Sequence, residues 1–236
     1  MQLFYSEHIA DKFVLTTEES KHLVKVLRKR VGDEVHFTNG TGGLFTCRVA
    51  IDNPKGALVE VVNSEEFEDK RPDLTLAVAP TKSMDRFEWM VEKACEIGVK
   101  TIIPILCENA ERDRIKLDRL HRITLAALKQ SLQVHRTLVG PMTSLTQFVE
   151  QAEGTKIIAH LPENQAGKTI HQCYLASSPV TILIGPEGDF SGKELNAAIN
   201  NGFEQVVLGT NRLRTETAAV VACTLVNQIY HAKNIS

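Results

Sequence analysis

Two stretches in the second half of the chain decide the fold: VTILIGPEGDFS at residues 180–191 and LGTNRLRTETA at residues 208–218. Each glycine-bearing segment follows a strand-like apolar run and precedes a helical pattern, which in the first stretch opens at the capping box of Ser191 and Glu194. A strand, a glycine loop and a helix N-terminus present free backbone N–H groups at the carboxyl edge of a parallel sheet. Two such loops close in sequence therefore predict a ligand crevice at that edge.

Residues 74–236 alternate strand and helix patterns, which indicates an α/β domain with a mostly parallel sheet. Strands are expected over residues 74–79, 101–105, 156–160, 180–184 and 205–208. Helices are expected over residues 84–97, 117–133, 144–152 and 191–202, and from Thr215 or Thr217 towards His231.

Residues 1–70 are predominantly β in pattern. Strands are expected over residues 34–39, 44–52 and 57–64, and the glycine-rich and proline-containing turns between them suggest a small barrel. One helix interrupts the strands, beginning at the capping box of Thr16 and Glu19 and ending at Gly32. The charged stretch 64–73, which contains Pro72, is interpreted as the linker between the two domains.

Composition excludes several classes of protein. The 236 residues are 43% hydrophobic, which is enough for a proper core, and the formal net charge of −2 gives no global attraction to nucleic acid. We expect neither a signal peptide nor a membrane span, because no run approaches about 18 apolar residues. The five cysteines lack C-x-x-C spacing, which argues against a zinc site or a disulfide framework and fits a reducing cytoplasm.

A local basic surface is predicted on the helix of the first domain. Lys21, Lys25, Arg28 and Lys29, with His22 and Arg30 beside them, form a cationic strip without an intervening acid. This strip is either a phosphate-contacting surface or the ordinary charged outer face of an amphipathic helix.

The charged residues of the second stretch also allow two interpretations. Arg212, Arg214 and Glu216 surround the start of the last helix, either as a solvated turn or as groups that hold an RNA backbone or orient a base. The glycines are either tight-turn residues or bare backbone that a ligand approaches. Neither loop is a Walker A or G-x-G-x-x-G motif, so a smaller anionic group, such as the carboxylate of an amino-acid-like cofactor, is favoured over phosphate.

Other chemistries have weak support. The eight histidines occur singly, without ligand spacing, so no metal site is expected. There is no G-x-S-x-G elbow, which argues against a hydrolase. Cys95, Cys107 and Cys223 lie in apolar patterns that are typical of buried structural thiols.

Taken together, these motifs closely resemble the RsmE family of ribosomal RNA uridine-N3 methyltransferases within the SPOUT superfamily. The resemblance covers nearly the whole chain, since HLVKVLR at residues 22–28, KACEIGV at 93–99 and Gln130-Ser131 match further family segments. Two departures are apparent. Asp189 stands where the family often has a second glycine, and Leu132 to Arg136 follow Gln130-Ser131 where the family has an arginine soon after.

The resemblance implies a specific organisation and activity. Residues 1–70 are expected to form a PUA-like RNA-binding β-barrel domain, and residues 74–236 a SPOUT domain tied in a deep trefoil knot that binds S-adenosyl-L-methionine. The enzyme is expected to be a cytoplasmic homodimer that methylates N3 of a specific uridine in 16S ribosomal RNA of the small subunit. A knot is too rare for the pattern alone to suggest.

The resemblance also assigns site residues. Arg214 is expected to orient the base and stabilise its developing charge, and Glu187 and Glu216 are candidate general bases. The cofactor is assigned to the backbone of Leu161, Gly185, Gly188, Leu208, Gly209 and Leu213, with Thr217 or Ala218 closing the pocket. RNA contacts are assigned to His22, Lys25, Arg28, Lys29, Arg136 and Arg212. The rival interpretation is a non-catalytic RNA-binding or ribosome-assembly factor.

The pattern of the last helix gives limited support to the dimer. Its apolar residues between Ala218 and Ile229 surround much of its circumference, which is more than one face against its own sheet requires. The surplus is buried either against a second copy or within a single chain.

Overall fold

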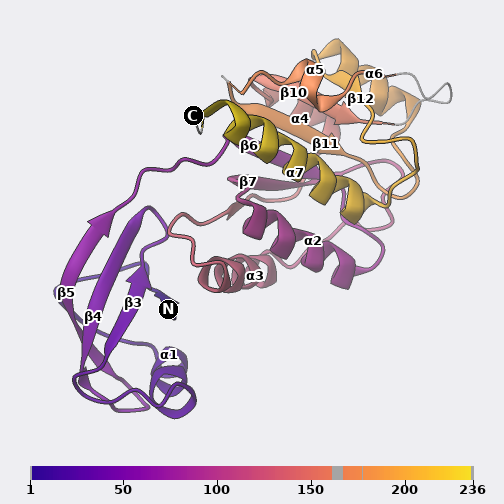
Figure 1. Ribbon diagram of the computed structural model, residues 1–236. Helices are drawn as coiled ribbons and strands as arrows, with labels where there is room; N and C mark the ends of the chain where they lie inside the picture. The colour runs from indigo at the N-terminus through magenta and orange to yellow at the C-terminus, as the bar shows by residue number, and fades with distance from the viewer. Residues whose placement is uncertain (1, 161–166, 177, 235–236) are drawn as a thin grey trace. The chain divides into compact units, whose positions relative to one another are not determined.

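The computed structural model describes residues 2–160, 167–176 and 178–234. The chain forms two compact units, one of Met1–Lys70 with Leu128–Arg136 and the other of Arg71–Ala127 with Thr137–Ser236. Figure 1 labels most of their helices and strands, numbered in chain order.

The first unit is a curled five-stranded sheet in the order β1-β3-β4-β5-β2. β1 runs parallel to β3, and the other pairs are antiparallel. Register shifts at Thr46/Cys47 and Val49/Ile51 interrupt the long β4–β5 ladder and bend it around a core that includes Phe4, Leu23 and Phe37. The strands are β1 (Leu3–Tyr5), β2 (Lys12–Val14), β3 (Glu34–Thr38), β4 (Gly43–Ile51) and β5 (Leu58–Glu66).

The helix of the first unit is shorter than the sequence predicts. α1 (Thr17–Lys21) continues as the π-helix η1 (His22–Val26), and Arg28 adopts a left-handed φ of 58°. The Lys29 N–H donates to the Leu23 carbonyl at 3.1 Å, a bond that closes the helix end across the left-handed Arg28. The expectation of a helix to Gly32 is therefore wrong, and Arg28 and Lys29 lie beyond the helix.

A segment from later in the chain completes the first unit. The Val134 carbonyl accepts hydrogen bonds from the Gly42 N–H at 3.0 Å and the Thr38 hydroxyl at 3.2 Å. The Lys129 ammonium lies 2.8 Å from a Glu19 carboxylate oxygen, and the Arg136 guanidinium donates to the Tyr5 hydroxyl at 3.3 Å. The interpretation of residues 1–70 and 74–236 as two contiguous domains did not anticipate this packing of residues 128–136.

The second unit is built on a seven-stranded sheet in the order β12-β10-β11-β6-β7-β8, with β9 also paired to β7. All of its strand pairs are parallel. The central strand β11 is buried along its whole length, which explains its continuous apolar run. The strands are β6 (Leu74–Val78), β7 (Thr101–Leu106), β8 (Leu138–Val139), β9 (Thr143–Ser144), β10 (Thr155–Ala159), β11 (Val180–Ile184) and β12 (Glu204–Val206).

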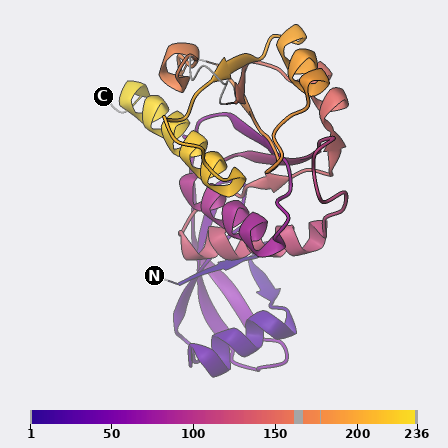
Figure 2. The same cartoon turned by 90° about the vertical axis from the view of Figure 1, so that its right-hand side faces the viewer.

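Helices cover both faces of this sheet. Ile182 belongs to the core beneath α2 and α7, whereas the next residue, Leu183, belongs to the core beneath α4 and α6. Figure 2 shows α7 and α6 on opposite sides of the strands. The helices are α2 (Met84–Ile97), α3 (Leu117–Gln130), α4 (Leu145–Gln151), α5 (Ile170–Cys173), α6 (Gly192–Asn200) and α7 (Thr215–Asn234).

The α/β class and the mostly parallel sheet are thus confirmed. The strand over 180–184 and the helix over 84–97 have the expected bounds, while the short elements β1, β2, β8, β9 and α5 were not predicted. In the described part of the chain, no helix combines the length and apolar character needed to cross a membrane.

Candidate functional site

The two glycine loops meet in a cavity of about 570 Å³ at the carboxyl edge of the sheet. This volume lies in the range of about 300–1,000 Å³ that is usual for small-molecule sites. The cavity opens where β10, β11 and β12 end and α7 begins. Its lining comprises Ala159, His160, Ile184–Glu187, Asp189, Val206–Gly209, Asn211–Thr215 and Ala218.

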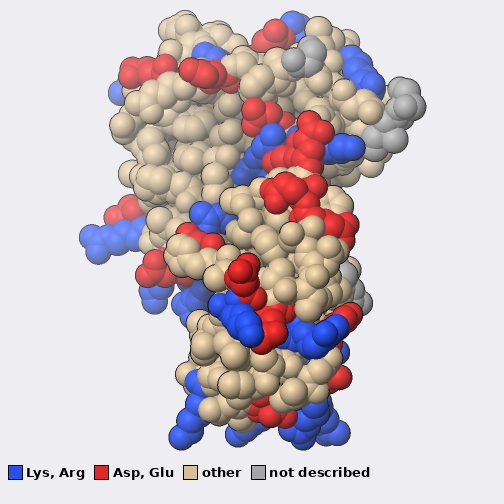
Figure 3. Space-filling view, turned by 90° about the vertical axis from the view of Figure 1, so that its left-hand side faces the viewer, with Lys and Arg blue, Asp and Glu red and all other residues tan. Residues whose placement is uncertain are grey.

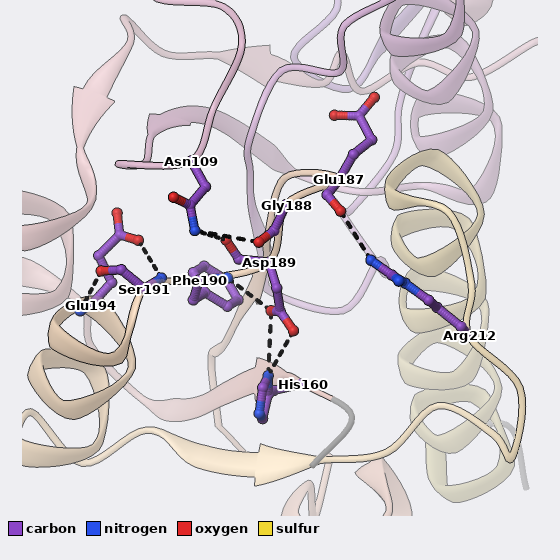
Figure 4. Close-up of polar contacts among 9 residues, drawn as sticks. All are labelled: Asn109, His160, Glu187, Gly188, Asp189, Phe190, Ser191, Glu194 and Arg212. Atoms are coloured by element: carbon purple, nitrogen blue, oxygen red, sulfur yellow. Dashed lines mark hydrogen bonds and ion pairs between the residues drawn. The ribbon is translucent and has the colours of Figure 1, made fainter. Parts of the chain in front are cut away.

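The buried side chain of Glu194 holds the first loop, residues 185–191, in position through hydrogen bonds. One carboxylate oxygen of Glu194 accepts the Ser191 N–H at 2.9 Å, and the other accepts the Glu108 N–H at 2.8 Å. The Ser191 hydroxyl accepts the Glu194 N–H in return, which is the capping box that the sequence predicts. Asn109, which sequence reasoning missed, donates to the carbonyls of Gly188 and Asp189 at 3.3 and 3.1 Å (Figure 4).

The second loop, residues 207–214, and the first residue of α7 are each tied to the first loop by one hydrogen bond. The Arg212 guanidinium donates to the Glu187 carbonyl at 3.1 Å (Figure 4), and the buried Thr215 hydroxyl donates to the Gly185 carbonyl at 3.0 Å. These bonds bring together segments that are about 25 to 30 residues apart in the chain. The crevice therefore follows from the topology of the sheet together with these two contacts.

The loop glycines serve different purposes. A Cβ on Gly185 would lie 3.0 Å from the Phe190 ring, and one on Gly188 would lie 3.1 Å from Asn109 Cβ. A Cβ on Gly209 would meet nothing within 4 Å. None of the three has a left-handed φ, so their backbone conformation does not by itself require glycine.

Most of the residues assigned to the cavity line it. Among the expected cofactor contacts, Gly188 packs against Asn109 outside the lining, and Thr217 is exposed on α7. Leu161 lies outside the described residues. The residues that do line the cavity are Gly185, Glu187, Leu208, Gly209, Arg212, Leu213, Arg214 and Ala218.

The two candidate bases differ in position. Glu187 lines the cavity, and one of its carboxylate oxygens accepts the Lys82 N–H at 3.0 Å. Glu216 is outside the lining and buried, with one oxygen 3.8 Å from the Arg86 guanidinium of α2. Its other oxygen is buried and has no hydrogen-bond partner among the described residues.

Sequence reasoning missed a pair of titratable side chains in the cavity wall. Both oxygens of Asp189 lie 3.3 Å from Nδ1 of His160, and both residues line the cavity (Figure 4). In the sequence, Asp189 stands out only as a departure from the family pattern, and His160 is one of the histidines that lack ligand spacing. The position of His160 at the carboxyl end of the expected strand 156–160 was the available signal.

Metal and cysteine chemistry find no support in the described residues. No group of three or more His, Cys, Asp or Glu side chains there is placed to hold a metal ion. Burial raises the pKa of Cys95 to about 11 and that of Cys223 to about 12, so little thiolate exists at neutral pH.

The RNA candidates of the first unit are not equivalent. Lys25 and Arg28 are exposed, whereas the Lys29 ammonium donates to the Glu34 carbonyl at 3.1 Å. His22 is half-buried, with its ring centroid 5.6 Å from that of Phe4. Figure 3 shows lysine and arginine side chains gathered at the bottom of the view, with acidic side chains between them.

Comparisons with known proteins agree with this architecture. The family of RNA methyltransferase domains matches residues 68–227, and the family of RNA methyltransferase PUA domains matches residues 15–62. Ribosomal RNA small subunit methyltransferase E of Aquifex aeolicus is 30% identical over 227 residues, covering 93% of this chain and 96% of that protein.

Solved structures extend the likeness to three dimensions. A probable rRNA-methyltransferase from Porphyromonas gingivalis has a TM-score of 0.92 and 36% identity, covering 98% of this chain and 99% of that one. A methyltransferase from Legionella pneumophila, in complex with the bound cofactor SAM, has a TM-score of 0.86, 28% identity and 96% coverage of both chains. On these matches the chain belongs to the RsmE family of ribosomal RNA small subunit methyltransferases, with an RNA methyltransferase domain and a PUA domain.

Proposed function

We propose that this protein transfers the methyl group of S-adenosyl-L-methionine to N3 of a specific uridine in 16S ribosomal RNA. The observation that carries the proposal is the single cavity formed by both glycine loops, in a chain of the RsmE family. The Legionella pneumophila relative with a bound SAM molecule supports the choice of cofactor.

The residues present fit this cofactor. Ile184, Val206, Leu208 and Leu213 give the cavity an apolar wall that suits an adenine ring. The space beside Gly209 is open, so the bare backbone can approach a ligand closely. When bound, S-adenosyl-L-methionine supplies an activated methyl group on a sulfonium centre.

Arg214 and Glu187 are the residues that we assign to the chemistry. Arg214 is exposed in the cavity lining, where its guanidinium can orient uracil and stabilise negative charge on the carbonyl oxygens of the base as N3 loses its proton. Glu187 is the favoured acceptor of that proton, because Glu187 is a lining residue of the cavity and Glu216 is not. The methyl group forms its new bond to N3 while the carbon–sulfur bond breaks, which leaves a neutral thioether.

RNA docking is assigned to the PUA domain. Because the net charge is −2, attraction to phosphate must be local, and the exposed Lys25 and Arg28 are the favoured contacts. Lys29 and Arg136 have hydrogen-bond partners within their own unit, so their contributions to RNA binding are expected to be smaller. Arg212, at the cavity, is placed to contact the RNA that enters it.

The path of the last connection supports the trefoil knot of the SPOUT superfamily. β12 is at one edge of the sheet, yet α7 packs against β6, β11 and α2. Residues 207–214 must therefore cross the carboxyl ends of β10 and β11. We infer that this crossing is the threaded part of the knot.

A homodimer is supported by an apolar hollow beside the cavity. This second hollow, of about 500 Å³, is lined in part by Ile170, Leu225 and Ile229, and it shares Val207, Leu208 and Gly209 with the first. A second copy seated there would cover the partly buried apolar residues of α7 and border the cofactor site. We place this dimer in the cytoplasm with its ribosomal substrate.

Mass spectrometry of 16S rRNA tests the function. Small subunits from a strain that lacks the protein are incubated with the protein and S-adenosyl-L-methionine, and N3-methyluridine is expected to appear. Arg214→Ala should abolish the product while cofactor binding persists. If the incubation produced no new methylated nucleoside while the protein still bound the RNA, the non-catalytic RNA-binding factor would be favoured.

A further inference from the structure

Asp189 has a backbone conformation that suits glycine better than aspartate. Its φ is 63°, in the left-handed region, and its N–H closes a tight turn with the Pro186 carbonyl at 3.0 Å. Residues other than glycine rarely adopt this conformation, although aspartate tolerates it better than most. A strained backbone in a cavity wall points to a role for the side chain that it carries.

The Asp189 carboxylate is held in one place. Its Oδ1 accepts the Phe190 N–H at 2.8 Å, both oxygens lie 3.3 Å from Nδ1 of His160, and Asn109 fixes its carbonyl at 3.1 Å. A carboxylate has about four acceptor positions, so about two remain after these bonds. The Asp189 side chain is 48% exposed and lines the cavity, which leaves those positions available to a ligand.

The charged groups of the cavity are divided between two places. Figure 4 shows the Arg212 guanidinium beside the Glu187 carbonyl and away from the Asp189–His160 pair. The carboxylate at the amino-acid end of a ligand would be repelled by the Asp189 carboxylate, so that end is expected to lie away from the Asp189–His160 pair. The Asp189 carboxylate is therefore available to accept hydrogen bonds from neutral donors. The two adjacent hydroxyls of a ribose match its two free acceptor positions.

We propose that Asp189 is a specificity residue that accepts hydrogen bonds from the ribose hydroxyls of the bound nucleoside, with His160 as its positioning residue. The inference rests on the proposed S-adenosyl-L-methionine site and names the group that holds its ribose. Acidic side chains at the carboxyl edge of parallel sheets bind ribose hydroxyls in other nucleotide-binding folds, which shows that the chemistry is suitable.

Calorimetry with S-adenosylhomocysteine and its 2′-deoxy and 3′-deoxy analogues tests the assignment. For the unmodified protein, loss of the contacted hydroxyl is expected to weaken binding by about tenfold or more, the effect of one hydrogen bond to a charged group. Asp189→Asn and Asp189→Gly should weaken the binding of S-adenosylhomocysteine by a similar factor. These variants should then bind the deoxy analogue almost as tightly as S-adenosylhomocysteine itself. If the loss of affinity from the Asp189 substitution and the loss from the missing hydroxyl simply added, Asp189 would not contact that hydroxyl and the inference would be overturned.

5′-Methylthioadenosine separates the ribose from the amino-acid end. Asp189→Asn should weaken the binding of 5′-methylthioadenosine by the same factor as that of S-adenosylhomocysteine. If only S-adenosylhomocysteine bound more weakly, the Asp189 carboxylate would contact the ammonium group of its amino-acid end, and the inference would be overturned. Asp113→Asn, on an exposed loop residue outside the cavity, is the matched control and should leave every affinity unchanged. If the unmodified protein bound neither S-adenosyl-L-methionine nor S-adenosylhomocysteine, the proposed function would fail as well.

The positioning role of His160 has its own test. His160→Ala should reduce the coupling between Asp189 and the ribose hydroxyl, and His160→Gln, which keeps a donor, should restore part of it. A loss of stability in His160→Ala with the coupling unchanged would show that His160 only fills space.

Discussion

The two glycine loops of the cavity look alike in sequence but differ in what their glycines do. In the loop after β11, Gly185 and Gly188 are packed so closely against Phe190 and Asn109 that a Cβ would need its neighbour to move. In the loop after β12, a Cβ on Gly209 would meet only open space. A glycine between a strand and a helix therefore marks either internal packing or room for a ligand, and the neighbouring atoms decide which.

Removing the buried support of the first loop is expected to have the largest effect. Glu194→Ala leaves the Ser191 and Glu108 N–H groups without their acceptor, which should lower the free energy of unfolding by about 2–4 kcal/mol. Urea unfolding measures this loss. Glu150→Ala on the exposed face of α4 is the control, and a loss no larger than that of the control would mean that the loop does not depend on Glu194.

How far these loops were predictable depends on how local their causes are. The capping box of Ser191 and Glu194 and the apolar strand before it lie within 15 residues, so pattern alone located the strand, the loop and the helix start. The Asp189–His160 pair joins segments 29 residues apart, and it forms only because β10 and β11 are neighbours in the sheet. No local spacing contains that information.

The first unit shows the same limit. Three-residue strands such as Leu3–Tyr5 are too short to display a period, and residues 128–136 join this unit through contacts with Thr38 and Gly42 that are about 90 residues away in sequence. The C-terminus of η1 was missed because Arg28, and not glycine, occupies the left-handed position.

A methyl group on the packed glycine sharpens the comparison. Gly185→Ala places a Cβ 3.0 Å from the Phe190 ring, so the ring must shift, and we expect destabilisation of about 1–3 kcal/mol in urea unfolding. Phe190→Leu, which shortens the side chain, should reduce the effect of Gly185→Ala in a double-mutant cycle. Independent, additive effects would show that the Phe190 ring is not what requires glycine there.

The open glycine should respond in the opposite way. Gly209→Val is expected to change the free energy of unfolding by less than about 1 kcal/mol, because nothing in the protein lies within 4 Å of the new Cβ. It should weaken S-adenosyl-L-methionine binding by about tenfold or more, or about 1.4 kcal/mol, because the side chain occupies ligand space. Gly192→Val, also in open space but outside the cavity, is the control, and equal calorimetric affinities for the two variants would place the ligand elsewhere.

The weakest expected effect comes from cutting an exposed bond between the loops. Arg212→Ala removes the hydrogen bond to the Glu187 carbonyl, and because Arg212 is exposed, stability should fall by less than about 1 kcal/mol. If Arg212 also contacts an RNA phosphate, the slope of log affinity for rRNA against log salt should fall by about one, while cofactor affinity stays within about twofold. Arg114→Ala, exposed and outside the cavity lining, should leave both quantities unchanged. If Arg212→Ala instead greatly weakened cofactor binding and left the salt slope unchanged, Arg212 would contact the cofactor and not an RNA phosphate.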